Sequence, residues 1–544
     1  MAKHLHDELA HTARVTVETR YGPITGGKAE NGSLSFLEVP YALPPVRFED
    51  PIALPDGFRY ENKEYVRETA YATQPLNDGQ AQGSPFEDKV GFGKPTENPL
   101  FLNIAIPPSF PEKKSFPVKV YIHGGFLQFG SPHSLGSQAQ YIAAERQEVW
   151  VNIGYRLSAF GFIGSESPKL TGNYGFKDQW VALEWIRSNI DSFGGNPNDI
   201  QISGLSAGAH SVHQLLHHAS ILPKGAMAPF QSAIMQSNAI LVDSKTPSEL
   251  QPQFDALCRA LNLDPRAEDI LSVLKDPKQV PWESITRVIE TDVIGKYGTF
   301  RGCLADDFLC VSPGLMERQK SGALARGLQE HGVKCVAVGD LTEEWYLYSI
   351  ANPINSPADI LENVERCFPR DVATRLLNAF PKLPDNANAE KSARHFGEVL
   401  SCGQVHLPVR VFAQDMEANG FPVLRYEIRW TPEQYRPFGK RFQFEETEIQ
   451  ADFGAGYVTH GGDRLLWAFR TVSLLPDQIA VAKAWIDEVD KYMKAIALDR
   501  SAQRDVRQML TLKEDKTIAW TDDGNWGDLM KLYDDIKGTQ RASL

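Results

Sequence analysis

The chain has 544 residues, of which 42% are apolar and 23% charged, as in a globular protein that buries a large core. Its formal net charge is −13 and it has no basic runs, which argues against nucleic acids and anionic membranes as partners. No run approaches the ~20 apolar residues that a membrane-spanning helix needs. Residues 1–14 lack the apolar core of a signal peptide, so we expect a cytoplasmic protein.

Hydrophobic patterning predicts the elements of the amino-terminal half in order. Alternating apolar residues or short apolar runs predict strands at 15–21, 34–39, 100–106, 118–122 and 148–153. Apolar residues three and four apart predict a helix over 179–186, and a strand at 199–203 follows it. Strands that alternate with helices indicate the α/β class, with a large, mostly parallel central sheet flanked by helices.

Two long segments are expected to shape a pocket over this sheet. Residues 70–98 are rich in Gly, Gln, Pro, Asn and Asp, which indicates a lid-like loop. Helical patterns dominate from about 245 to 400, interrupted by one apolar strand at 334–338, and another strand is predicted at 423–428. The tail after residue 499 is polar and predicted to be helical. We expect the whole chain, 1–544, to form a single domain.

The pattern G-x-S-x-G at residues 204–208 joins the strand 199–203 to an amphipathic helix. Its two glycines remove side chains that would collide where strand and helix approach each other, and the turn exposes the hydroxyl of Ser206. This is the geometry of a nucleophile elbow. Because glycine and serine are common, the same residues also fit an ordinary turn. A nucleophilic serine further needs a base, an acid and oxyanion donors from elsewhere in the chain.

Five further motifs accompany this turn in a fixed order. They read P-Y-A-L-P-P-V-R-F, E-N-P-L-F-L-N-I, G-Y-R-L-S-A-F-G-F, G-N-Y-G-F-K-D-Q-W-V-A-L-E-W and F-G-G-N-P, at residues 40–48, 97–104, 154–162, 172–185 and 193–197. With them the chain resembles the type-B carboxylesterase/lipase family, the cholinesterase-like branch of the α/β-hydrolase fold, over about 15–469. The resemblance implies that fold, a fungal-type or microbial carboxylesterase, a small-molecule ester as partner, and no metal or organic cofactor.

In this family an acid and then a histidine follow the serine along the chain. Three downstream histidines are candidates for the base: His331, His406 and His460. The loop 453–463 reads F-G-A-G-Y-V-T-H-G-G-D and resembles the family's G-x-x-H-G-D/E loop. We therefore assign the base to His460, which would take the proton of Ser206.

The acid is expected just after the strand 334–338. The family pattern G-x-N-x-x-E-G places it at Glu344, although two neighbouring family positions differ in this chain. Glu343 and Asp340 remain alternatives, and all three carboxylates also fit a solvated charge run. In the proposed role, Glu344 orients His460 and stabilises its cationic form.

An oxyanion hole needs backbone N–H groups aimed at the developing charge. One is expected from Ala207, directly after the nucleophile. The family sequence H-G-G-G-F-x-x-G reads H-G-G-F-L-Q-F-G at 123–130, so the other donors are expected at Gly125 and Phe126. A shift by one residue would give Gly124 and Gly125 instead.

The chain departs from the family pattern beside the nucleophile and at one structural support. Leu205 replaces the glutamate that commonly precedes the serine, which removes a buried negative charge. Asn196 replaces an aspartate, so a contact of Arg156 there would be a hydrogen bond rather than an ion pair. Arg47 and Glu97 remain available as the family's other ion pair.

Other positions bear on compartment, support and metal binding. Pro99 replaces the first disulfide cysteine of the family and the second family pair has no match, which fits a reducing compartment. The six cysteines lack C-x-x-C spacing, which argues against a zinc or thioredoxin-like site. Ser237 resembles a serine that steadies the acid. His213 and His217 are four residues apart, but no third ligand has matching spacing, so we expect a packed helix face and no metal site.

Together these features predict a serine hydrolase that cleaves carboxylic esters through an acyl-enzyme intermediate. Leu205 and Phe126 make the surroundings of Ser206 dry and less anionic, which favours a neutral, apolar ester. Acyl transfer or lactone hydrolysis would use the same intermediate, and a non-catalytic binding protein with this fold is a remote alternative. The sequence predicts neither the physiological ester nor the oligomeric state.

Overall fold

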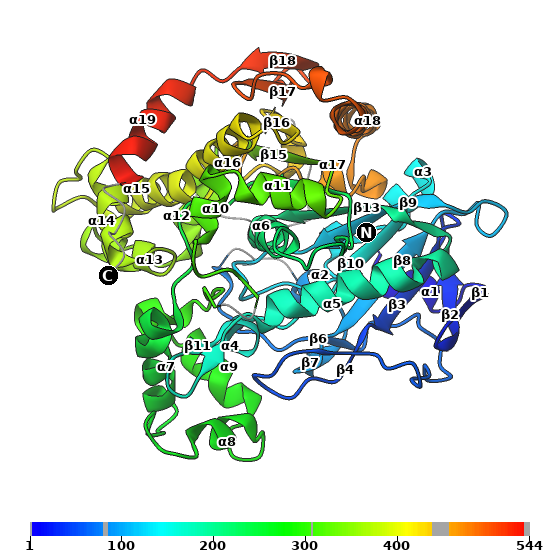
Figure 1. Cartoon of the computed structure of the whole chain (residues 1–544), viewed down its shortest axis with the longest axis horizontal. Coiled ribbons are helices and arrows are strands. Elements are labelled where there is room, and N and C mark those ends of the chain that lie inside the picture. The colour runs from blue at the N-terminus through cyan, green and yellow to red at the C-terminus, as the bar shows by residue number, and fades with distance from the viewer. Residues whose placement is uncertain (1–2, 80–84, 306–307, 438–455, 538–544) are drawn as a thin grey trace.

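The computed structural model describes residues 3–79, 85–305, 308–437 and 456–537 (Figure 1). A twelve-stranded sheet takes strands from both ends of the chain. Its order is β1 (Arg14–Thr19), β2 (Gly22–Lys28), β3 (Leu34–Pro40), β8 (Phe101–Ile106), β10 (Val149–Ile153), β9 (Phe116–Ile122), β13 (Gly195–Leu205), β14 (Ser232–Gln236), β15 (Cys335–Leu341), β16 (Val423–Ile428), β17 (Gln508–Leu512) and β18 (Ile518–Asp522).

The strands in the middle of this sheet run parallel. Every neighbouring pair from β10 through β17 is parallel. The pairs from β1 to β10 at one edge and the β17–β18 hairpin at the other are antiparallel. The predicted mostly parallel sheet is therefore confirmed, with antiparallel edges.

Helices cover both faces of the sheet (Figure 1). One core forms with α5 (Tyr174–Asn189), α6 (Ala207–Ala219), α11 (Ala323–Glu330) and α16 (Leu407–Ala418), and the other with α3 (Gln140–Arg146), α17 (Arg464–Trp467) and α18 (Pro476–Leu498). Side chains alternate along β15: Val336 and Val338 join the first core, whereas Cys335 and Ala337 join the second. A strand buried on both faces therefore reads as a continuous apolar run.

The remaining described elements are shorter or lie outside the large sheet. Helices follow one another between residues 247 and 401: α7 (Pro247–Ala260), α8 (Ile270–Lys275), α9 (Trp282–Glu290), α10 (Leu315–Lys320), α12 (Trp345–Ala351), α13 (Ala358–Glu365), α14 (Arg370–Asn378) and α15 (Ala389–Ser401). Within 70–98, β6 (Ala70–Ala72) pairs in parallel with β7 (Lys94–Thr96), and α2 (Phe86–Val90) lies between them. Residues 80–84 of that segment lie outside the described residues. The other short elements are α1 (Leu5–Leu9), α4 (Ser158–Phe162), β4 (Ala42–Leu43), β5 (Ile52–Ala53), β11 (Gly164–Ser165) and β12 (Leu170–Thr171).

The carboxyl-terminal tail differs from the prediction. It is not only helical, because β17 and β18 form a hairpin that extends the sheet before α19 (Trp526–Lys537) begins (Figure 1). Polar residues within both short strands obscure their pattern in the sequence. Among the described residues, no helix combines the length and the apolar character that crossing a membrane requires.

Candidate active site

The turn at Ser206 lies between the last residue of β13 and the first residue of α6. Ser206 has φ +60° and ψ −123°, a strained conformation for a residue with a side chain. Its N–H donates to the carbonyl of Gln236 at 2.8 Å, which holds the turn against β14. A Cβ at Gly204 would lie 2.3 Å from the carbonyl carbon of Gly208, so this position requires glycine. The predicted strand–turn–helix geometry is present.

Glu344 and His460 meet just beyond the carboxyl end of β15. The Nδ1 atom of His460 lies 2.6 Å from Oε2 of Glu344, and the other carboxylate oxygen accepts the N–H of Leu341 at 2.8 Å. Both side chains are buried, with exposed fractions of 3% for His460 and 0% for Glu344. The Nε2 atom of His460 is buried and has no hydrogen-bond partner among the described residues. A carboxylate at Nδ1 favours the tautomer in which Nε2 is the acceptor.

The loop that carries His460 lies against the elbow. A Cβ at Gly461 would lie 3.5 Å from Cδ2 of Leu205, the residue before Ser206. The ring of Tyr348 stands edge-on to His460, with 5.3 Å between the ring centroids. The structure thus brings the segments of Ser206, Glu344 and His460 to one place, although they are far apart in sequence.

Two of the alternative residues make local contacts instead. Glu343 accepts the N–H of Val458 at 2.8 Å and so holds the chain that leads to His460. The Nδ1 atom of His331 lies 2.8 Å from the carbonyl oxygen of Ala226. Neither side chain joins the contact between Glu344 and His460.

Asp340 and His406 belong to a buried ion network. Asp340 contacts Nδ1 of His406 at 2.8 Å and a guanidinium nitrogen of Arg410 at 2.9 Å. Asp523, just after β18, contacts Arg410 at 2.8 Å and Arg425 at 3.0 Å. Burial raises the pKa of Asp340, but the attraction of Arg410 and the hydrogen bond to His406 outweigh it and hold the pKa well below its usual value. Through Arg410 and Arg425, the network of Asp340 and Asp523 joins the tail to the sheet.

The turn at residues 124–127 faces the elbow. A Cβ at Gly124 would lie 3.1 Å from Cβ of Ser206. Phe126 has φ +55°, which is uncommon for a residue with a side chain, and its ring packs edge-on against Tyr348 at 6.1 Å between centroids. Among the described residues, four N–H groups near Ser206 donate to no backbone carbonyl: those of Gly124, Gly125, Phe126 and Ala207. The N–H groups of both predicted donor sets are therefore available to an oxyanion.

The structural ion pairs differ in part from the expectation. Arg47 and Glu97 do pair, with 2.6 Å between Nε and Oε2. Arg156 does not face Asn196; it forms two contacts with Asp178, at 2.8 Å and 2.6 Å. The prediction for Asn196 is wrong because the guanidinium is buried and takes the carboxylate that α5 presents. Asp178 lies inside the motif at 172–185, so the sequence did contain the signal.

Two further predictions concern side chains near α6 and β14. The buried hydroxyl of Ser237 has no hydrogen-bond partner among the described residues, so the prediction that it steadies the acid is wrong; its N–H donates to the carbonyl of Gly339 at 2.9 Å. His213 and His217 stack with 4.9 Å between ring centroids. The Nδ1 atom of His213 accepts the N–H of Ile240 at 3.0 Å, and burial lowers the pKa of His213 to about 3. These two rings pack in the core.

A cavity of about 80 Å³ adjoins α6 close to the elbow. His210 lines it, one helical turn after the nucleophile, and donates its N–H to the carbonyl of Ser206 at 2.9 Å. Other lining residues come from distant segments and include Lys245, Arg301, Cys367 and Gln404. Sequence reasoning missed them because none lies in a recognised motif.

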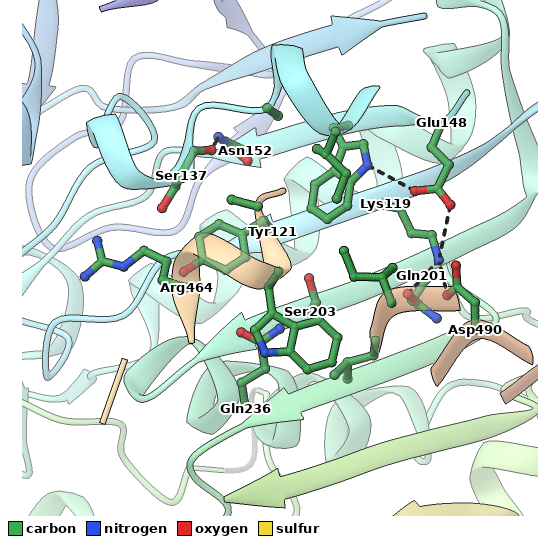
Figure 2. A pocket seen from close by; sticks show the side chains of 17 residues that line it. Lys119, Tyr121, Ser137, Glu148, Asn152, Gln201, Ser203, Gln236, Arg464 and Asp490 are labelled. Atoms are coloured by element: carbon green, nitrogen blue, oxygen red, sulfur yellow. Dashed lines mark hydrogen bonds and ion pairs between the residues drawn. The ribbon is translucent and has the colours of Figure 1, made fainter. Parts of the chain in front are cut away.

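Figure 2 shows another cavity, of about 40 Å³, across the sheet from α6. Gln201 and Ser203 of β13 line it, whereas Ile202 between them packs into the core with α6. At one end, the ammonium of Lys119 lies 2.9 Å from Gln201 and 3.1 Å from Asp490 of α18. This cavity faces α18 rather than the helix that follows Ser206.

The chain is similar to known esterases over most of its length. An uncharacterized esterase/lipase of Schizosaccharomyces pombe is 29% identical over 92% of this chain and 92% of its own length. A carboxylic ester hydrolase of Gibberella moniliformis is 27% identical over 93% of this chain and 92% of its own length. An acetylcholinesterase of Bungarus fasciatus is 28% identical over 79% of this chain and 72% of its own length.

The fold and the family follow from two further matches. A solved PNB esterase structure superimposes with a TM-score of 0.70 at 22% identity, over 96% of this chain and 100% of that chain, which shows the α/β-hydrolase fold. Residues 13–472 match the Carboxylesterase family. This match spans most of the sequence, and the chain therefore belongs to the carboxylesterase family of ester hydrolases.

Proposed function

We propose that the protein hydrolyses carboxylic esters through an acyl-enzyme intermediate, with Ser206 as nucleophile, His460 as base and Glu344 as orienting acid. The observation that carries the proposal is the buried contact of 2.6 Å between His460 and Glu344, which leaves Nε2 of His460 without a partner among the described residues. That nitrogen accepts the proton of Ser206 as the hydroxyl attacks the ester carbonyl.

Charge separates during the attack, and both charges need stabilisation. His460 becomes an imidazolium, which the carboxylate of Glu344 stabilises through Nδ1–H. The carbonyl oxygen becomes an oxyanion, which the backbone N–H groups of Gly125, Phe126 and Ala207 receive. In the alternative donor set, Gly124 takes the place of Phe126.

The cycle closes by a second attack on the same carbonyl carbon. The leaving alcohol takes its proton from His460, and water then attacks the acyl-enzyme while His460 again acts as base. An alcohol in place of water would give acyl transfer, and a cyclic ester would make the same steps a lactone hydrolysis.

Apolar side chains beside Ser206 support an apolar group next to the scissile carbonyl. Leu205 is buried, and the ring of Phe126 packs on Tyr348, which in turn contacts His460. An acidic side chain at position 205 would have favoured a cationic alcohol, and none is present there. We therefore propose an ester whose acyl and alcohol groups are apolar where they join the ester.

The six cysteines all lie in the described residues and form no disulfide with one another. This supports the proposal that the protein acts in the reducing cytoplasm. Cell fractionation with an antibody against the protein tests the location, and recovery from the secreted fraction alone would contradict it.

A fluorophosphonate probe and p-nitrophenyl butyrate test the catalytic proposal. The native protein should be labelled at Ser206 and should release p-nitrophenol, whereas Ser206→Ala should lose both properties. Ser248→Ala, at an exposed serine of α7, serves as the matched control and should keep both. Hydrolysis retained by folded Ser206→Ala would refute the assignment.

A further inference from the structure

The cavity of about 80 Å³ lies beside α6, the helix that follows the elbow. One of its walls, residues 239–245, follows β14, and Gln236 at the end of β14 accepts the N–H of Ser206. His210, on the next turn of α6, lines another wall. A group bound in this cavity therefore lies close to the nucleophile.

Arg301 lines the same cavity and is linked to the oxyanion turn. Its neighbour Phe300 donates its N–H to Oε1 of Gln128 at 3.2 Å and accepts the amide N–H of that side chain at 2.5 Å. The same amide donates to the carbonyl of Phe126 at 3.0 Å. Gln128 thus links the segment of Arg301 to the turn at Phe126, where the carbonyl oxygen of the ester would bind.

Two of the cations that line the cavity are neutralised by carboxylates. Lys296 lies 2.5 Å from Glu365, and Arg366 lies 3.0 Å from Asp292. Because both cations are paired with carboxylates, we do not expect either of them to bind an external anion.

Arg301 and Lys245 form no ion pair among the described residues. The guanidinium of Arg301 contacts only uncharged acceptors, the Sγ atom of Cys367 at 3.6 Å and Oε1 of Gln404 at 3.4 Å. The ammonium of Lys245 lies 3.4 Å from the carbonyl oxygen of Glu365. Two cations without carboxylate partners therefore line one small cavity.

The acidic residues in the lining accept hydrogen bonds from other groups and form no ion pair with Arg301 or Lys245 among the described residues. Asp243 accepts the N–H of Met316 at 2.9 Å. Glu249 accepts the N–H and the hydroxyl of Thr246, both at 3.0 Å, and so caps α7. Burial is the main cause that lowers the pKa of Lys245; the charges of Glu249 and Glu365 oppose it, and the charge of Arg301 adds to it. An anion in the cavity would relieve the repulsion between the two cations.

We propose that the ester substrate carries a free carboxylate, which binds between Arg301 and Lys245 while the ester carbonyl lies at Ser206. The planar guanidinium matches a carboxylate in two-point contact, and the ammonium adds a point charge. A volume of about 80 Å³ accommodates a carboxylate with adjoining methylene groups. The substrate class is a half-ester of a dicarboxylic acid, apolar beside the ester and anionic at its far end, rather than the fully neutral ester that the sequence predicts. This inference rests on the proposed ester hydrolysis.

Matched pairs of esters test the inference. We would measure kcat/KM for mono(4-nitrophenyl) esters of linear dicarboxylic acids of increasing length, each against the 4-nitrophenyl ester of the monocarboxylic acid with the same number of carbons. The native protein should prefer at least one acidic ester by about 10-fold or more, since a charged hydrogen bond supplies discrimination of this order. Added salt should reduce that preference.

Variants separate recognition from structure. Arg301→Gln and Lys245→Gln should each abolish most of the preference for the acidic ester by raising its KM. The kcat/KM for the neutral ester should stay within about 2-fold of the native value. Arg301→Lys should keep part of the preference. Arg366→Gln, at a cation of the same cavity that is already paired, should leave the preference intact. Equal hydrolysis of both esters by the native protein, or an equal loss for both in Arg301→Gln, would overturn the inference. Because neutral esters are hydrolysed through Ser206 in either case, absence of that activity would instead refute the proposed function.

Discussion

The proposed acid and base are both held in place by contacts beyond the one that joins them. Glu344 uses one oxygen for the N–H of Leu341 and the other for His460. Tyr348 contacts the rings of both His460 and Phe126. These contacts fix orientation before substrate arrives, which lowers the reorganisation needed in the transition state.

Replacing Glu344 tests its assignment against the neighbouring acid. Glu344→Gln should lower kcat for p-nitrophenyl butyrate by about 10³–10⁴-fold, because an amide neither fixes the same tautomer nor stabilises the imidazolium. Glu343→Gln is the matched control: its carboxylate accepts the N–H of Val458 and does not contact His460 among the described residues, so kcat should fall less than about 10-fold. The reverse order of effects would move the acid by one residue.

Phe126 is the residue by which this oxyanion turn differs from the family pattern. Phe126→Gly removes a ring beside Tyr348 and His460 and also relieves a positive φ. The ratio of kcat/KM for a branched acyl ester to that for a straight acyl ester should rise by about 10-fold. Steady-state kinetics on p-nitrophenyl pivalate and valerate measure this ratio. An unchanged ratio would show that the ring of Phe126 does not contact the acyl group.

Single residues were predictable where a motif fixed their spacing. Ser206, Glu344 and His460 each stand in such a motif, and the structure brings their segments together. Arg301 stands in no motif, and its place beside Lys245 depends on how distant loops fold together. Only the three-dimensional structure reveals that neither cation has a carboxylate partner among the described residues.

At the scale of elements, predictability depended on how completely a strand is buried. The apolar runs of β9, β10 and β15 are covered on both faces and were predicted within a few residues. The strand β14 has only five residues and begins with a polar one, so it was missed although it lies between β13 and β15. The hairpin β17–β18 was missed because polar residues interrupt both strands.

The packing of α18 on the sheet depends on a buried group of charges. Lys119 contacts Asp490 of α18 at 3.1 Å, and Arg146 also contacts that carboxylate (Figure 2 labels Lys119 and Asp490). Lys119→Met leaves Asp490 buried with one cation fewer, so the free energy of unfolding should fall by about 3–5 kcal/mol. Urea denaturation measures the loss.

A second pair on the same helix provides the control. Lys483 and Asp487 lie 3.0 Å apart, with exposed fractions of 51% and 47%. Lys483→Met should therefore change the free energy of unfolding by less than about 1 kcal/mol. Since the cavity at Lys119 faces away from the nucleophile, neither variant should alter KM; similar losses of stability in both would contradict the argument.

At the scale of the whole molecule, the network of Asp340, Arg410, Arg425 and Asp523 joins the centre of the sheet to the tail. The pKa of Asp340 is lower in the folded protein than in the unfolded chain. Its contribution to stability is therefore fully present above the unfolded pKa of ~3.9 and is lost as the pH falls toward the folded pKa.

The pH dependence of unfolding tests this network. The native protein should be more stable than Asp340→Asn by about 3 kcal/mol or more at neutral pH, because the substitution leaves buried guanidinium groups without a carboxylate. The difference should shrink once the pH falls below ~4. Urea denaturation between about pH 3 and pH 7 follows it, and parallel curves for the two proteins would contradict the assignment.

The hairpin at the end of the chain also has a consequence for solubility. β17 occupies the hydrogen-bonding edge of β16, a strand whose six residues are all buried. A chain that ends before residue 508 would present that edge, with its unpaired N–H and carbonyl groups, as a template for other chains. The tail, which carries none of the proposed catalytic residues, thus covers the edge of the fully buried strand β16 and leaves the more exposed strand β18 at the edge of the sheet.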